Sequence, residues 1–168
     1  MELSIFTVLR DFGIAFIVAT GWGVLFGSPK RLLLVAGLLG GLGHCIRFVL
    51  VELDMGLITA TLAGSIFIGL IGIFAAHKVD SPPVVFTMPA CITMIPGLYA
   101  YRTMMAGIKM TDLERVEQDP SILINMSHYL TLTMSLLFTL AIGICIGALL
   151  FRKSSVRDIS LTKALHKN

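Results

Sequence analysis

The amino-acid sequence predicts an all-α integral membrane protein, a bundle of five transmembrane helices with the fourth broken at Pro96-Gly97. Two observations carry this prediction: 56% of the 168 residues are hydrophobic and only 14% are charged. A soluble domain has roughly 25% charged residues, because its surface has to face water. The mean hydropathy of +0.90 agrees, so lipid rather than water is expected to surround most of the chain.

Five apolar segments are long enough to cross a membrane, since about 20 helical residues span a hydrocarbon core about 30 Å thick. They are residues 5–26, 32–51, 55–76, 84–108 and 122–150. The first segment is too long for a cleavable signal peptide and lacks a small-residue cleavage site, so it counts as a span. Residues 1–151 are therefore expected to form one five-span membrane domain, and residues 152–168 a basic cytoplasmic tail.

Positive charge is distributed unevenly over the connections between these spans. If the spans alternate in direction, eight of the thirteen Lys and Arg residues fall on one side. They are Lys30, Arg31, Lys78, Arg152, Lys153, Arg157, Lys163 and Lys167. Because cytoplasmic loops carry the excess of Lys and Arg, we expect the amino terminus outside and the carboxyl terminus in the cytoplasm.

The composition also argues against several function classes. The net charge is only +3 and no basic run alternates with aromatic residues, which argues against a nucleic-acid partner. Cys45, Cys91 and Cys145 lie within apolar stretches and are interpreted as small core residues rather than metal ligands. No phosphate-binding loop, paired-ligand motif or nucleophile beside a base occurs, so we expect neither an enzyme nor a cofactor.

Ionisable residues within the spans mark the candidate site, because charge at membrane depth is costly and usually faces a bundle interior or a watery cavity. His44 and Arg47 are one helical turn apart in the second span and share a face. Four apolar residues follow Arg47 before the span ends, which favours a buried position for the pair.

Further polar groups lie in the outer halves of three other spans. Tyr99 and Arg102 repeat the one-turn spacing in the fourth span, and His128 begins a polar stripe in the fifth. Together these groups predict a polar cavity in the outer half of the bundle. The alternative is that they extend to the outer interface, and for Arg10 and Asp11 in the first span this alternative is preferred.

Pro96 and Gly97 lie at the centre of the fourth span. Proline lacks the N–H that a continuous helix needs, and glycine adds backbone freedom, so the helix is expected to break there. Discontinuous helices of this kind form substrate sites in secondary transporters, and the positive end of the second half-helix suits a carboxylate. A simple proline kink that aids packing is the alternative.

Small residues four positions apart indicate close helix contacts. Ser65 and Gly69 form such a pair in the third span, and Gly143 and Gly147 form one in the fifth. These pairs let helix backbones approach closely, so they predict packing rather than chemistry.

Two motifs carry a resemblance to a known family. GLGHCIR at 41–47 and MIPGLYAYR at 94–102 resemble the small five-span membrane subunit of the threonine/serine exporter family, of the split two-subunit type that includes succinate exporter pairs. The likeness covers nearly the whole chain in the number, order and spacing of spans. The family's Gly-His-x-x-Arg corresponds to Gly43, His44 and Arg47, and its Pro-Gly followed by Tyr and Arg to Pro96, Gly97, Tyr101 and Arg102.

The resemblance implies a subunit of a secondary transporter in the bacterial inner membrane. It would export small hydrophilic carboxylates, threonine and serine or a dicarboxylate such as succinate, coupled to the proton gradient, together with a second, larger membrane subunit. Its substrate-binding residues are expected to be Arg47, Pro96, Gly97, Tyr99, Tyr101 and Arg102, and its proton-coupling residues His44 and His128. The alternative function is a non-transporting membrane subunit that stabilises or regulates a partner.

Overall fold

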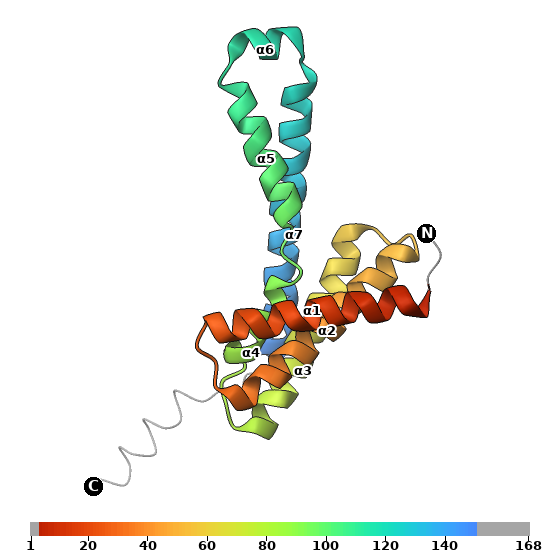
Figure 1. Cartoon of the computed structure of the whole chain (residues 1–168), viewed down its shortest axis with the longest axis vertical. Helices are drawn as coiled ribbons and strands as arrows, with labels where there is room; N and C mark the ends of the chain where they lie inside the picture. The colour runs from red at the N-terminus through yellow and green to blue at the C-terminus, as the bar shows by residue number, and fades with distance from the viewer. Residues whose placement is uncertain (1–3, 151–168) are drawn as a thin grey trace, which may run out of the picture.

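The computed structural model describes residues 4–150, and every regular element within that range is a helix (Figure 1). The helices are α1 (Ile5–Leu25), α2 (Lys30–Glu52), α3 (Leu57–Val79), α4 (Val84–Ile92), α5 (Gly97–Met110), α6 (Leu113–Gln118) and α7 (Ser121–Leu150). Four of them, α1, α2, α3 and α7, are long and apolar enough to cross a membrane, and α4 with α5 forms a bent pair that makes a fifth span. The predicted five-span helical fold is confirmed, and the expected tail at 152–168 lies outside the described residues.

The turn between α1 and α2 is formed by residues with restricted or unusual backbone conformations. Gly27 has a φ of 68°, which a side chain would disfavour. Pro29 precedes α2 as its N-cap, and the Ser28 hydroxyl donates a hydrogen bond of 3.0 Å to the Val85 carbonyl. This bond ties the α1–α2 connection to the start of α4, so the α1–α2 and α3–α4 connections lie at the same end of the bundle.

The hydrophobic core surrounds α4, which packs against α1, α2 and α3. Phe86 on α4 and Met94 just after it are fully buried, together with Leu32 from α2 and Ile68 from α3. Backbone that leaves the helical ladder at membrane depth is tolerated when protein surrounds it. The buried position of Met94 places the break between α4 and α5 inside the bundle.

The two small-residue pairs lie against each other where α3 crosses α7. A Cβ atom added to Gly147 would lie 2.5 Å from the carbonyl carbon of Gly69, and one added to Gly143 would collide with the Ser65 hydroxyl. The Ser65 hydroxyl also lies 3.5 Å from the Thr139 carbonyl oxygen of α7. The close helix contact that the sequence predicts is therefore present.

We expect Gly147→Ala to destabilise the protein by about 1–3 kcal/mol, because the added methyl group would force the α3 and α7 backbones apart. Gly13→Ala is the matched control, since a Cβ at Gly13 meets nothing within 4 Å. Thermal unfolding in detergent measures the difference. Equal stability of the two variants would contradict the close packing of α3 on α7.

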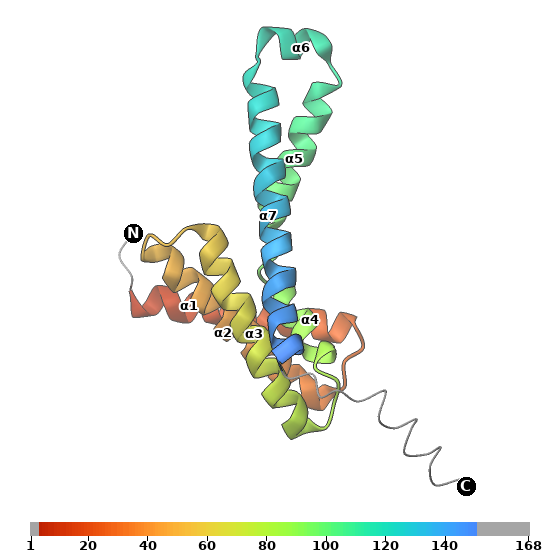
Figure 2. The same cartoon turned by 180° about the vertical axis from the view of Figure 1, so that it is seen from behind.

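One part of the chain projects away from the bundle. Helix α5, helix α6 and the amino-terminal part of α7 form a long hairpin, here called the arm, while the carboxyl-terminal part of α7 packs against α3 (Figures 1 and 2). The arm arises because α4 and α5 meet at an angle of 59°. Helix α6 falls in the polar connection at 109–121, for which the sequence indicated no helix.

Candidate functional site

The break in the fourth span begins earlier than Pro96. Helix α4 ends at Ile92, and Pro96, with φ −77° and ψ 59°, forms the N-cap of α5. The Gly97 N–H donates a 2.8 Å hydrogen bond to the Ile95 carbonyl, which closes an inverse γ-turn around Pro96. The predicted break at Pro96-Gly97 is confirmed, and it extends back to Thr93 because proline also restricts the residues before it.

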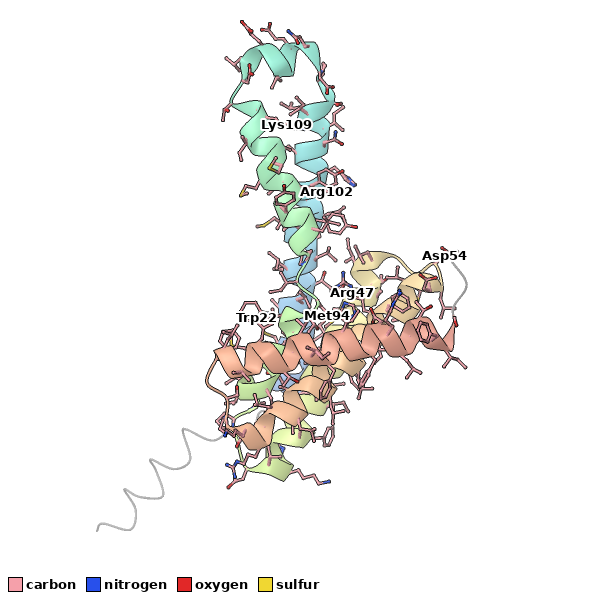
Figure 3. The ribbon with its side chains drawn as sticks, in the orientation of Figure 1. Trp22, Arg47, Asp54, Met94, Arg102 and Lys109 are labelled. Carbon is pink, nitrogen blue, oxygen red and sulfur yellow. The ribbon has the colours of Figure 1, made fainter. Side chains whose placement is uncertain are left out.

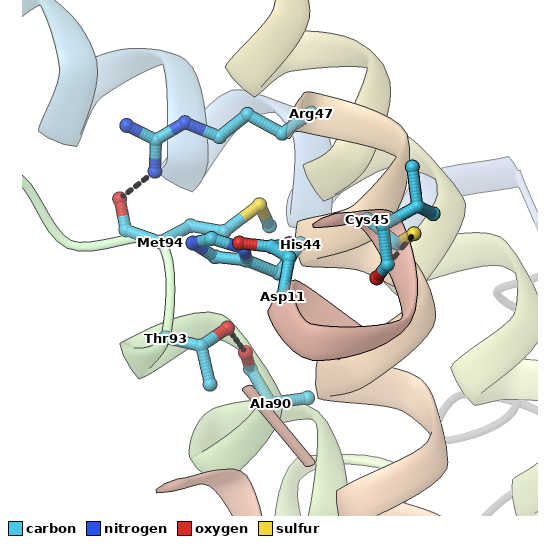
Figure 4. Close-up of polar contacts among 8 residues, drawn as sticks. Asp11, His44, Cys45, Arg47, Ala90, Thr93 and Met94 are labelled. Atoms are coloured by element: carbon cyan, nitrogen blue, oxygen red, sulfur yellow. Dashed lines mark hydrogen bonds and ion pairs between the residues drawn. The ribbon is translucent and has the colours of Figure 1, made fainter. Parts of the chain in front are cut away.

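Arg47 of α2 reaches into this break. Its Nη1 donates a hydrogen bond of 2.9 Å to the carbonyl oxygen of Met94 (Figure 4). In a continuous helix, that carbonyl would accept a hydrogen bond from the backbone N–H four residues further on. A guanidinium group thus takes the place of the missing backbone donor, and its other N–H groups remain for a second partner.

His44, one turn before Arg47, pairs with Asp11 of α1. The His44 Nδ1 and Asp11 Oδ2 atoms are 2.9 Å apart, and the two side chains are 26% and 19% exposed (Figure 4). An ionised carboxylate only accepts hydrogen bonds, so with Asp11 ionised the His44 Nδ1 carries a hydrogen. This hydrogen bond uses one of the two ring nitrogens of His44.

Asp11 was not expected at the site, since the sequence favoured a place at the outer interface for it. The signal that could have identified it is the tight turn at Gly27 and Ser28. In two antiparallel helices, residues at equal distances from such a turn face each other, and Asp11 and His44 satisfy this condition. A Cβ added to Gly41 would collide with the Phe12 ring, so α1 and α2 also pack closely near this pair.

Tyr99 extends the cluster toward the arm. The Arg47 guanidinium lies within electrostatic range of the Asp11 carboxylate and the Tyr99 side chain. We call the group of Asp11, His44, Arg47, Tyr99 and the Met94 carbonyl the break cluster. Three helices, α1, α2 and α5, contribute to it together with the break between α4 and α5.

The remaining predicted residues lie along the arm, not beside Arg47. The Tyr99 and Tyr129 rings have their centroids 6.3 Å apart, and the Arg102 guanidinium lies 5.4 Å from the centre of the Tyr129 ring. His128 is exposed beside the same ring, at 5.5 Å, and Tyr101 is also exposed. Figure 3 shows Arg47 beside Met94 and Arg102 further along the arm. Tyr99, Arg102 and His128 thus gather around the Tyr129 ring, a residue that the sequence did not indicate.

A bundle of four long apolar helices and one discontinuous span, with charged side chains at the discontinuity, defines a multi-pass membrane protein of the kind that carries solutes. The chain belongs to the threonine/serine exporter family, because the family model described as Threonine/Serine exporter, ThrE, matches residues 11–150. No solved structure matches it. The family match includes the break cluster and the arm, and it assigns the chain to exporter-type membrane transport.

Proposed function

We propose that this chain is one membrane half of a secondary exporter that moves small hydrophilic carboxylates, either threonine and serine or a dicarboxylate such as succinate. The hydrogen bond from Arg47 to the Met94 carbonyl carries this proposal. It fixes a cation at a broken span, where charge-assisted hydrogen bonds to a carboxylate are strong. Helix α5 begins at Gly97 and adds the positive end of its dipole on the same side of the break.

The pair of His44 and Asp11 is proposed to couple transport to the proton gradient. Histidine changes its charge near neutral pH, and a carboxylate partner stabilises its charged form. A proton taken up at Nε2 would turn this hydrogen-bonded pair into an ion pair beside Arg47. His128 is proposed as a second proton-coupling residue at the arm, next to Ser127 and Thr131 in a shallow pocket on α7.

A second, larger membrane subunit is the proposed partner. Helix α5 packs mainly on α7, and its Leu98, Met104 and Ile108 side chains are more than half exposed. In lipid there is no hydrophobic driving force for helices to associate. A two-helix arm would therefore need close packing against further helices to stay in place. A partner covering the arm would supply that packing, and a pull-down from native membranes should recover a multi-span protein.

Asp11→Asn is expected to reduce proton-driven efflux at least about tenfold, a change of about 1.4 kcal/mol in the barrier. The asparagine keeps a hydrogen-bond acceptor for His44 but removes the charge that stabilises the protonated ring. Exchange of labelled for unlabelled substrate at equal pH needs no net proton movement and should persist. The measurement compares both modes in vesicles that contain the full complex.

Arg10→Gln is the control for this experiment, because Arg10 is exposed and adjacent to Asp11 in the sequence. It should leave both transport modes unchanged. Proton-driven efflux at the wild-type rate in Asp11→Asn would rule out a coupling role for the pair.

The proposed topology places the amino terminus outside and the carboxyl terminus in the cytoplasm of a bacterial inner membrane. The contact between Ser28 and Val85 supports it, because it brings the start of α2, with Lys30 and Arg31, and the end of α3, with Lys78, to one end of the bundle. Figure 1 shows α6 pointing away from that end. Reporter fusions after Asn168 and within the α6 connection should therefore report opposite sides of the membrane, and the same side for both would contradict the topology.

A further inference from the structure

A cleft of about 290 Å³ lies in the arm between α5 and α7, next to α6. Its polar lining includes Arg102 and Lys109 from α5, Ser121, Asn125 and Tyr129 from α7, and Asp119 from the α6–α7 connection. We propose that this cleft is a binding site for a small anionic group, a carboxylate or a phosphate. The cleft shares no residue with the break cluster. It contains Arg102, one of the expected substrate-binding residues, so the inference deepens the proposed function and rests on it in that part.

The two cations of the cleft lie on the same face of α5. Arg102 and Lys109 are seven residues apart, which is two helical turns, and the aligned pair of Asn125 and Tyr129 faces them from α7. Figure 3 shows both cations on the arm. A group bound between them would meet a guanidinium and an ammonium from one helix and an amide and a hydroxyl from the other.

Neither cation is neutralised by a neighbouring acid. Arg102 contacts the Tyr129 ring, and among the described side chains no ion pair is formed by Arg102 or Lys109. A cation that lies over an aromatic face keeps the N–H groups at its edge available as donors. The cleft therefore has unused hydrogen-bond donors that match an anion.

Asp119 is the one acidic side chain among the described residues of the lining, and the start of α7 holds it in place. Its Oδ1 accepts a hydrogen bond of 3.1 Å from the backbone N–H of Ser121. With two cations and one carboxylate, the lining residues that the structure describes have a net charge of +1. Such a lining attracts an anion more strongly than a neutral molecule or a zwitterion.

The anion could come from two sources. The polar α6 connection places the cleft at the edge of the apolar part of the arm, where a dissolved carboxylate and the phosphate of an anionic lipid both have access. Two probes distinguish them. Binding of labelled succinate is measured at equilibrium in a neutral detergent. Retention of phosphatidylglycerol relative to phosphatidylcholine is measured by native mass spectrometry of the protein released from nanodiscs.

The full chain is expected to bind succinate or to retain phosphatidylglycerol in preference to phosphatidylcholine. The double variant Arg102→Gln, Lys109→Gln should weaken that binding at least about tenfold. The control, Lys30→Gln with Lys78→Gln, removes two cations at the other end of the bundle and should leave the binding unchanged. Succinate binding is measured in the Arg47→Ala background, so that the cation proposed to hold the substrate at the break cluster cannot contribute. This separates a failure here from a failure of the transport proposal.

Two further variants keep the test independent of folding. Arg102→Lys with Lys109→Arg conserves the charge and should retain binding. Asp119→Asn keeps a side-chain oxygen that can accept the hydrogen bond from the Ser121 N–H, but it removes the negative charge and should strengthen binding about twofold or more. The proposal is overturned if the wild type binds neither probe, if the double glutamine variant binds as the wild type does, or if Asp119→Asn weakens binding.

Discussion

Replacing Arg47 by alanine is expected to reduce substrate efflux at least about a hundredfold, while the protein still inserts into the membrane. The change removes the only side chain that the structure shows bound to the Met94 carbonyl within the described residues. It also removes the cation proposed to hold the substrate carboxylate, and a lost charged partner costs about 3 kcal/mol or more at a partly buried site. Efflux of preloaded threonine and succinate from cells measures the effect.

Arg47→Lys tests which property of the arginine matters. A lysine keeps the charge, but its single ammonium group cannot donate to the Met94 carbonyl and to both oxygens of a carboxylate with the fork geometry of a guanidinium. We expect the lysine variant to insert and to be as stable as the wild type, but not to transport. Arg31→Ala is the control, since Arg31 is exposed at the other end of the same helix. Wild-type efflux in Arg47→Ala would reduce the residue to a structural role.

Pro96→Ala is expected to lower efflux at least about tenfold without lowering stability. Pro96 is the N-cap of α5, and its ring fixes the φ angle of the turn that separates α4 from α5. An alanine has a backbone N–H and a high helix propensity, so the ladder of α4 could extend toward α5 and release Arg47 from the Met94 carbonyl. Vesicle efflux and thermal stability in detergent are measured side by side.

Pro82→Ala is the matched control, because Pro82 is exposed before the start of α4 and takes no part in the break. It should change neither quantity. A Pro96→Ala protein that is less stable would indicate a kink that aids packing, and one that is equally active would show that transport does not need the break.

The span boundaries and the break could be predicted from the sequence because they depend on local chemistry. A run of about 20 apolar residues has few alternatives to a membrane helix, and a proline at mid-span removes a backbone donor wherever the helix lies. The direction of α5 after the break could not be predicted. Many backbone conformations satisfy Pro96 and Gly97, and the 59° bend results from the packing of α4 in the bundle and of α5 on α7.

The part of the candidate site that depends on local spacing could also be predicted. His44 and Arg47 share a helix face through their spacing, which is a local property, and the structure places both beside the break. Asp11 and Tyr129 belong to other helices, so their contribution depends on how α1 and α7 dock. The sequence predicted one cavity for these residues, whereas the structure places some beside Arg47 and others along the arm. Side chains at the same membrane depth on different helices need not face the same point.

The most direct test of the proposed function is efflux from vesicles that contain the larger membrane subunit, recovered by pull-down, with and without this chain. The vesicles are loaded with threonine or succinate, a pH gradient is imposed, and the initial efflux rate is measured. We predict rapid efflux only when both subunits are present. Full efflux from the larger subunit alone would contradict the account and would identify this chain as a non-transporting subunit.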